Sequence, residues 1–147
     1  MLTGRGNLTK VEAAQFNPVT LAFVGDAVYS TYVRERLALS GNGKASDFQR
    51  AAIKIVSAKG QSAFLDRILS LLTEEESEIF RRGKNAKKAT KSKSASSLEY
   101  NRSTGFEAVL GYLYLTGEEE RIGQLLSNLT DEDFKIPEKT QGLRSFR

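Results

Sequence analysis

Two acidic residues stand alone within apolar stretches of this sequence. Asp26 is the one charged residue in AFVGDAVYSTYV at 22–33, and Glu107 is the one charged residue in GFEAVLGYLYLT at 105–116. A carboxylate buried among apolar side chains costs several kcal/mol unless a basic side chain, backbone donors or a metal ion compensates it. We expect the two acids to meet and to share one compensating ligand.

Each acid also has a purely structural interpretation. Asp26 could pair with a buried arginine such as Arg102, and Glu107 could close a capping box with Thr104 at a helix N-terminus. The two acids together favour a divalent cation, because Mg²⁺ prefers oxygen ligands and is commonly held by one or two carboxylates plus water and phosphate. A magnesium site of this kind is typical of phosphodiester hydrolysis.

The composition narrows the chemistry further. The sequence contains neither cysteine nor histidine, so thiolate or imidazole metal sites, disulfides and Ser-His-Asp triads are excluded within one chain. The lack of cysteine fits a reducing compartment. No apolar run is long enough to span a bilayer, and the N-terminus lacks the apolar centre of a secretion signal. We therefore expect a cytoplasmic protein that makes no contact with membranes.

Basic residues are concentrated in one segment of the chain. The segment 81–103 holds eight basic residues and one acidic residue, whereas the rest of the chain holds 14 basic and 17 acidic residues. Such a basic segment on a mildly acidic body predicts a polyanionic partner at one face of the protein.

The elements that must position these residues read as helices. With 147 residues, 39% of them hydrophobic and 27% charged, the chain suits one globular domain. Asn17 and Pro18 begin a helix that ends at Gly41. A capping box from Ser46 to Gln49 begins a second helical region, 45–72, which we expect to break near Gly60.

The remaining sequence continues this pattern. A capping box from Thr73 to Glu76 begins a helix over 73–88, and a polar loop is expected at 89–97. Helices are expected at about 104–116 and 118–129, before a frayed tail. Because alternating strand patterns and hairpin dipeptides are missing, the sequence predicts an all-α fold. The expected organisation is an N-terminal extension at 1–16, a catalytic domain at 17–130 and a C-terminal tail at 131–147.

Several motifs, in their order and spacing, resemble the catalytic domain of ribonuclease III. They are LAFVGDAV, IVSAKGQSAFL, FRRGKNAK and YNRSTGFEAVLGYLYL, and the resemblance runs over roughly 17–127. It is closest to the minimal branch, Mini-ribonuclease III, in which the catalytic domain stands without a double-stranded RNA-binding domain. The resemblance implies the all-α endonuclease fold and a homodimer. A helix that is apolar on every side supports the dimer, with Phe23, Val24 and Val28 as interface candidates.

The resemblance also implies an activity. It implies Mg²⁺-dependent cleavage of double-stranded RNA that leaves 5′-phosphate and 3′-hydroxyl ends. In the minimal branch the substrate class is precursor large-subunit (23S) ribosomal RNA, and a ribosomal protein bound to that RNA can assist. The family's aspartate and glutamate match Asp26 and Glu107, which become the catalytic and metal-binding candidates. Full-length members carry three further acids where this chain has Val19, Ala22 and Thr104, so phosphate and water must supply more of the metal ligands.

The basic segment supplies the candidate RNA contacts, which are Arg81, Arg82, Lys84, Asn85, Lys87 and Lys88, with Lys91 and Lys93 as looser electrostatic contacts. The alternative for each is a solvated side chain or one that serves a helix C-terminus. Two other functions stay open. One is a non-catalytic protein on the same fold that binds structured RNA or the ribosome. The other is a helical interaction module whose basic loop docks an acidic partner.

Overall fold

The computed structural model describes residues 1–41, 43–88 and 96–136 of the chain. Every regular element in these ranges is a helix, which confirms the all-α prediction. No helix in the described ranges has the length and apolar character needed to cross a membrane. The elements are α1 (Lys10–Ala14), α2 (Pro18–Ser40), α3 (Ala45–Val56), α4 (Ala58–Ile68), η1 (Leu69–Leu71), α5 (Glu74–Asn85), α6 (Ser97–Leu115), α7 (Glu119–Leu126) and η2 (Asp131–Phe134).

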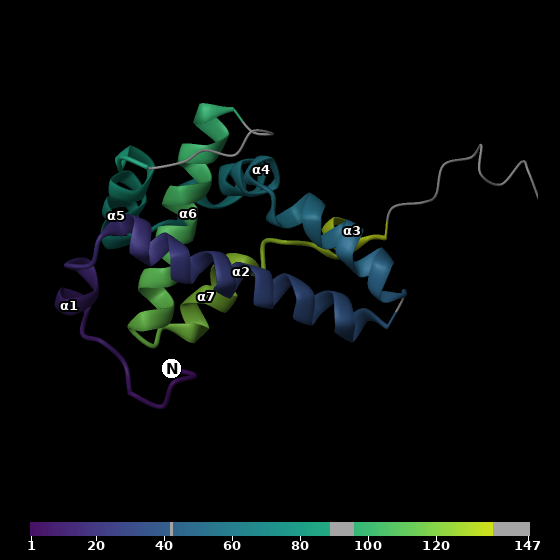
Figure 1. Cartoon of the computed structure of the whole chain (residues 1–147), viewed down its shortest axis with the longest axis horizontal. Helices are drawn as coiled ribbons and strands as arrows, with labels where there is room; N and C mark the ends of the chain where they lie inside the picture. The colour runs from purple at the N-terminus through teal and green to yellow at the C-terminus, as the bar shows by residue number, and fades with distance from the viewer. Residues whose placement is uncertain (42, 89–95, 137–147) are drawn as a thin grey trace, which may run out of the picture.

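Helices α2 and α6 form the centre of the molecule, and the long α2 runs across α6 (Figure 1). The ends of α2 confirm the sequence prediction. The Asn17 side chain accepts a hydrogen bond from the Val19 N–H at 2.8 Å, Pro18 occupies the first helical position, and Gly41 closes the helix with a φ of 66°. These local signals set where α2 begins and ends, and α6 sets which of its faces is buried.

An aromatic cluster joins three helices in the core. The ring centroid of Tyr29 on α2 lies 5.0 Å from that of Phe106 on α6 and 6.3 Å from that of Phe64 on α4. Phe64 and Phe106 complete the cluster at 5.8 Å. All three side chains are buried, so the cluster fixes α4 and α2 against the middle of α6.

Helix α6 begins earlier than the sequence predicts. Its capping box is formed by Ser96 and Glu99, so the expected start near 104 is wrong. Thr104 lies inside the helix, where its hydroxyl donates to the Tyr100 carbonyl at 3.0 Å. The structural interpretation of Glu107 as a capping-box residue is therefore wrong, because the N-terminal N–H groups of α6 lie two turns earlier.

The region 45–72 also differs in detail from its prediction. Helix α3 begins at Ala45 after Lys44, whose N–H donates to the Asp47 carboxylate at 3.1 Å, so the box from Ser46 is wrong. The break falls at Ser57, which ends α3 and whose hydroxyl caps α4, whereas Gly60 lies within α4. The capping box from Thr73 to Glu76 at the start of α5 is confirmed.

Segments on both sides of the expected domain boundaries pack onto the same core. Ala13 in α1 and Phe134 in η2 are both buried, and the Leu8 N–H donates to the Leu115 carbonyl at 2.8 Å. The boundaries at 16 and 130 stay a prediction. Lys91, Lys93 and the tail from 137 onward lie outside the described residues.

Candidate active site at the crossing of α2 and α6

Two glycines allow the central helices to approach each other at backbone distance. A Cβ atom on Gly25 would lie 1.7 Å from the carbonyl oxygen of Glu107, and one on Gly111 would lie 1.9 Å from the carbonyl oxygen of Leu21. On α2, Gly25 lies four residues after Leu21, whose carbonyl contacts Gly111. On α6, Gly111 lies four residues after Glu107, whose carbonyl contacts Gly25. The crossing is therefore reciprocal, and any larger side chain at either glycine would separate the helices.

The crossing brings the two predicted acids together. Asp26 follows the glycine that touches the backbone of Glu107, and the two carboxyl groups are close enough to interact directly. The expectation that both acids are buried is wrong for Asp26, which is exposed, whereas Glu107 is half-buried. The buried stripe of α2 passes through Gly25 and Tyr29 and leaves Asp26 at its margin, so the pair lies where the crossing meets solvent.

No basic side chain neutralises this pair in the described part of the chain. Its ion pairs include neither Asp26 nor Glu107. Arg102, the suggested partner of Asp26, is bound to α4 instead. It donates to the Ser62 hydroxyl and carbonyl at 2.8 and 2.9 Å and to the Asp66 carboxylate at 2.5 Å. The structural interpretation of Asp26 as the partner of Arg102 is therefore wrong.

The electrostatics of Glu107 reflect this missing counter-charge. The pKa of Glu107 is raised from 4.5 to about 8, and the largest cause is the burial of its carboxyl group. A hydrogen bond from Gln61 lowers that pKa, and the adjacent carboxylate of Asp26 raises it. A carboxyl group in this state gains from a nearby cation, because the cation stabilises the ionised form that burial and Asp26 disfavour.

Gln61 is a third member of the site that sequence reasoning missed. Its side chain is 2% exposed, and its amide nitrogen donates to Glu107 Oε2 at 3.1 Å. A signal for it was present, since Gln61 occupies the buried face of α4 together with Phe64, Leu65 and Ile68. A polar residue at an apolar position of a helix needs a polar partner, and here that partner is the catalytic candidate.

The donor set suits a hard divalent cation. Two carboxylates of different helices face each other without a counter-charge, which is the arrangement that Mg²⁺ accepts when water and phosphate complete its ligands. In the described ranges no cluster of three or more His, Cys, Asp or Glu side chains suited to a metal ion occurs. The pair therefore supplies at most two carboxylate ligands to a cation, and other oxygen donors must complete its shell.

The basic end of α5 packs beside the stretch of α6 that carries Glu107. A Cβ atom on Gly83 would lie 2.9 Å from Gly105 Cα and 3.2 Å from the Thr104 carbonyl oxygen, so α5 and α6 also touch at backbone distance. Arg82 and Lys84 flank Gly83 in the sequence. The basic segment thus begins where α5 touches Thr104 and Gly105 of α6, two to three residues before Glu107 in the sequence.

The two arginines at this end of α5 already have partners. Arg81 pairs with Glu78 of the same helix at 2.6 Å. Arg82 donates to the backbone carbonyls of Ala14 and Phe16 at 2.7 and 3.3 Å, and it thereby ties α5 to the segment before α2. The guanidinium of Arg82 thus has a structural role that the sequence does not reveal.

The other predicted RNA contacts lie at the end of α5 and just beyond it. The Lys88 ammonium donates to the carbonyls of Lys84 and Ala86 at 3.0 and 2.7 Å, which serves the C-terminus of the helix. Asn85 and Lys87 are exposed, and Lys84 is half-buried with its ammonium 5.9 Å from the Phe80 ring centroid. Each of these side chains reaches the surface at the same end of α5.

Comparisons with known proteins place this architecture among ribonucleases. The model of the ribonuclease III domain matches residues 19–118. The chain is 46% identical over 114 residues to the Mini-ribonuclease 3 of Symbiobacterium thermophilum, covering 78% of this chain and 88% of that protein. It is 37% identical over 141 residues to the Mini-ribonuclease 3 of Clostridium tetani, covering 93% of each. A crystal structure of a Fusobacterium nucleatum protein, 31% identical, superposes with a TM-score of 0.70 over 77% of this chain and 90% of that one.

Proposed function

Because this chain belongs to the ribonuclease III family of endoribonucleases, we propose that Asp26 and Glu107 form its catalytic, Mg²⁺-binding centre. The observation that carries the proposal is the contact between the two carboxyl groups without a basic partner among the described residues. An acid pair left without a counter-charge at a backbone crossing is costly for folding alone, and such perturbed groups mark functional sites.

The chain's own residues have distinct tasks in this proposal. Asp26, exposed at the margin of the crossing, meets water and the phosphate backbone, whereas the half-buried Glu107 holds its carboxylate in a fixed place. Mg²⁺, when bound, supplies charge neutralisation and Lewis-acid activation of a water and of the scissile phosphate. The expected products carry 5′-phosphate and 3′-hydroxyl ends.

The substrate class is double-stranded RNA, and we assign its contacts to the end of α5. A-form RNA is recognised through its phosphates and 2′-hydroxyls, which suits the exposed Asn85 and Lys87 and the half-buried Lys84 at the end of α5. Lys84, Asn85 and Lys87 are proposed to contact RNA directly, and Arg81 and Lys88 to do so after exchanging their present partners. Arg82 contributes positive charge and holds α5 in place.

Precursor large-subunit (23S) ribosomal RNA is the proposed natural substrate, with cytoplasmic maturation of ribosomes as the setting. A ribosomal protein bound to that RNA is the proposed assisting partner. The alternative, a non-catalytic RNA-binding protein on the same fold, predicts the same affinity for RNA but no cleavage.

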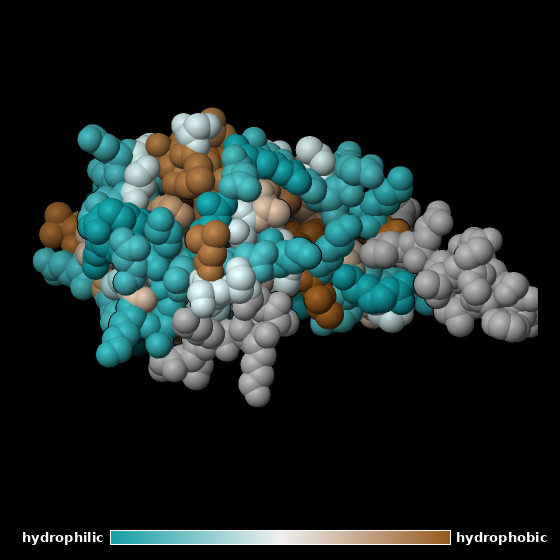
Figure 2. All heavy atoms as spheres, turned by 90° about the horizontal axis from the view of Figure 1, so that it is seen from above, coloured by the Kyte–Doolittle hydropathy of each residue, from teal (hydrophilic) through white to brown (hydrophobic). Residues whose placement is uncertain are grey.

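A homodimer is proposed through the exposed side of α2. Phe23, three residues before Asp26, is 80% exposed, and Phe16 and Val19 near the start of α2 are 38% and 36% exposed. Val24 and Val28 are half-buried. Figure 2 shows apolar residues gathered in separate patches on a mostly hydrophilic surface. An exposed phenylalanine next to the acid pair is well explained by a second copy of the chain that covers it.

The test is cleavage of a ribosomal precursor transcript and of a long RNA duplex in Mg²⁺, with Ca²⁺ as the control for binding without cleavage. Asp26→Asn is expected to slow cleavage roughly 10³-fold, because several kcal/mol of metal-dependent stabilisation are lost. The matched control is Asp131→Asn, since Asp131 is a fully exposed aspartate paired with Arg36 far from the acid pair. Cleavage by Asp26→Asn at the wild-type rate would contradict the proposal. Binding of RNA without cleavage by the wild type would favour the non-catalytic alternative.

A further inference from the structure

We propose that Gln61 is a positioning residue of the active site, which holds the carboxylate of Glu107 in the orientation that binds the metal. This inference rests on the proposed function of the acid pair and adds a neutral residue from α4 to a site otherwise built by α2 and α6. It is carried by three observations: the burial of Gln61, the pair of acceptors on its amide nitrogen, and the backbone corner that holds it.

The two acceptors determine which way the amide of Gln61 points. Its nitrogen donates to the Val56 carbonyl at 2.8 Å and to Glu107 Oε2 at 3.1 Å. If the amide were rotated by half a turn, its oxygen would face the Val56 carbonyl, which only accepts hydrogen bonds. The Val56 carbonyl therefore locks the amide with its donor group toward Glu107.

The opposite end of the amide shows that this arrangement is not optimal for stability. Gln61 Oε1 is buried and has no hydrogen-bond partner in the described structure. A buried acceptor without a partner costs free energy, and an apolar side chain of similar shape would avoid that cost. Apart from the bond to the nearby Val56 carbonyl, the polar contact that Gln61 makes is the hydrogen bond to Glu107, the catalytic candidate.

A rigid corner between α3 and α4 holds Gln61 in place. Val56 is the last residue of α3, and Ser57 caps α4 through its hydroxyl, which accepts from the Gly60 N–H at 3.1 Å. A Cβ atom on Gly60 would lie 2.2 Å from the Lys54 carbonyl oxygen, so the two helices meet here at backbone distance. Gln61, the residue after Gly60, is thus fixed to the backbone at one side and to Glu107 at the other.

The consequence for the site is an ordered carboxylate. The hydrogen bond to Oε2 restricts the rotation of the Glu107 carboxylate. Outer hydrogen bonds to metal-binding side chains act in this way, and their removal typically weakens metal binding by about 10–100-fold. Gln61 itself contributes an amide donor to the carboxylate and does not need to touch RNA.

The test measures Mn²⁺ binding to the RNA-free protein by electron paramagnetic resonance of the free ion. Gln61→Met keeps the length and shape of the side chain but removes both donors. We expect it to weaken Mn²⁺ binding about 10-fold or more, with little change in thermal stability, because the orphaned acceptor is removed together with the donors. The matched control is Gln49→Met on the exposed face of α3, which is expected to bind Mn²⁺ like the wild type.

A second variant and a kinetic readout separate positioning from packing. Gln61→Asn retains an amide but is too short to bridge Val56 and Glu107, so it is expected to behave like Gln61→Met. In cleavage assays both variants should need about 10-fold more Mg²⁺ for half-maximal rate, with an unchanged KM for RNA at saturating Mg²⁺. Wild-type Mn²⁺ affinity in folded Gln61→Met, or in folded Gln61→Asn should the first variant fail to fold, would overturn the inference.

The proposed function is tested separately by Asp26→Asn in the same titration. Loss of the Mn²⁺ site in Asp26→Asn, together with wild-type binding in Gln61→Met, would refute the role of Gln61 and leave the acid pair as the metal site. Binding of Mn²⁺ that Asp26→Asn does not alter would refute the acid pair itself, and the role of Gln61 would fall with it.

Discussion

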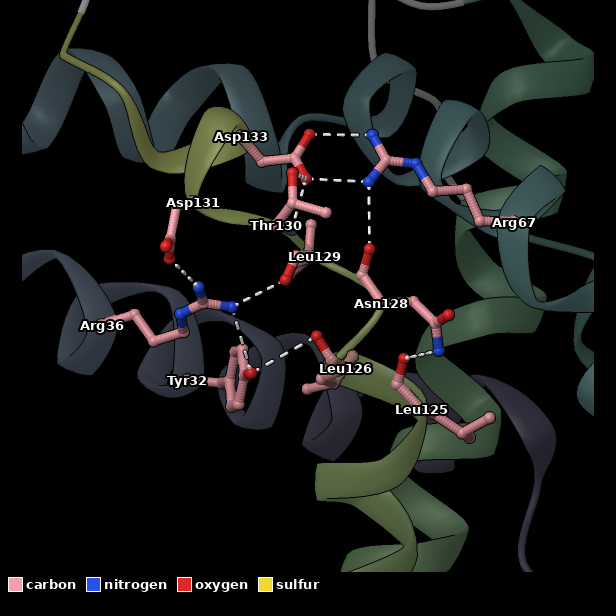
Figure 3. Close-up of polar contacts among 10 residues, drawn as sticks. All are labelled: Tyr32, Arg36, Arg67, Leu125, Leu126, Asn128, Leu129, Thr130, Asp131 and Asp133. Atoms are coloured by element: carbon pink, nitrogen blue, oxygen red, sulfur yellow. Dashed lines mark hydrogen bonds and ion pairs between the residues drawn. The ribbon is translucent and has the colours of Figure 1, made fainter.

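Two carboxylates on the same core have opposite surroundings. Asp133 in η2 receives both terminal nitrogens of Arg67 at 2.8 Å and the Thr130 N–H at 2.7 Å (Figure 3). These hydrogen bonds hold the pKa of Asp133 well below its usual range. Glu107 accepts a hydrogen bond from the neutral Gln61 and lies against the carboxyl group of Asp26, and its pKa is raised. We call the Arg67–Asp133 pair closed, because its two charges neutralise each other. We call the Asp26–Glu107 pair open, because no basic side chain among the described residues pairs with either acid.

The presence or absence of a basic partner distinguishes charges that hold the fold together from charges that are available for function. Arg67 also donates to the Asn128 carbonyl at 3.1 Å, and nearby Arg36 donates to the Leu129 carbonyl and to Asp131 (Figure 3). These contacts fasten the segment after α7 to α4 and α2, and each of the two arginines is paired with an aspartate. The open pair forms no ion pair among the described residues, and the glycine contacts hold α2 against α6 without it. A negative pair that the fold does not need is available to a cation.

The largest expected effect comes from neutralising the open pair. Glu107→Gln should slow RNA cleavage roughly 10³-fold, because it removes one of two metal-binding carboxylates. Its free energy of unfolding in metal-free buffer at neutral pH should equal or exceed that of the wild type, since the cost of burying an ionisable carboxyl group is removed. Single-turnover cleavage and urea unfolding measure the two quantities. If Glu107→Gln were less stable than the wild type but cleaved RNA normally, the Asp26–Glu107 pair would be structural and not catalytic.

The next effect comes from separating the helices beneath the open pair. Gly25→Ala places a methyl group 1.7 Å from the Glu107 carbonyl oxygen and should destabilise the protein by about 3 kcal/mol or more, with loss of cleavage. The matched control is Gly123→Ala in α7, where a Cβ atom meets nothing within 4 Å. That control should be neutral or stabilising by up to about 1 kcal/mol. Thermal unfolding of both variants distinguishes the crossing from general helix effects.

Breaking the closed pair should lower stability and leave cleavage nearly unchanged, the opposite of the result expected for Glu107→Gln. Asp133→Ala removes the acceptors of Arg67 and of the Thr130 N–H and should destabilise the protein by about 2 kcal/mol. Its cleavage rate at a temperature where it is folded should stay close to that of the wild type. A large loss of activity without loss of stability would show that the Arg67–Asp133 pair also serves the active site.

The pH dependence of stability should have opposite signs for the two carboxylates. Between pH 4.5 and about 8 the folded protein keeps a proton on Glu107 that the unfolded chain has released, so metal-free stability should fall as pH rises. We expect a fall of at least about 1 kcal/mol, and a smaller one in Glu107→Gln. Asp133 stabilises the fold above its unfolded pKa of 3.8, and this contribution is lost as pH falls below that value. Denaturant unfolding at several pH values measures both.

The smallest effect should come from single charges at the end of α5. Lys87→Ala should weaken RNA binding a few-fold and lower the salt dependence by about one phosphate contact, with unchanged stability, because Lys87 is exposed. Arg82→Ala should instead destabilise the protein by about 1–3 kcal/mol, because it leaves the carbonyls of Ala14 and Phe16 without their donor. Binding titrations at two salt concentrations, together with thermal unfolding, separate the two basic residues.

The sequence predicted most of the helices and identified the two acids, but it did not predict how exposed the acids are or which residues contact them. The ends of α2 follow from Asn17, Pro18 and Gly41, whose effects act within a few residues. The start of α6 was misplaced, because two possible capping boxes lie on one continuous helix and only packing selects between them. The exposure of Asp26 was missed because an apolar helix does not show which of its faces a partner covers.

By itself the sequence determined the all-α architecture, the absence of histidine and cysteine chemistry, and the identity of two solitary acids about eighty residues apart. Tertiary structure alone decided that Gly25 and Gly111 press α2 onto α6, that Gln61 donates to Glu107, and that Arg102 binds α4. The physical reason is the range of the interactions. Capping and periodicity act within one or two turns of a helix, whereas the meeting of distant side chains depends on where whole helices cross.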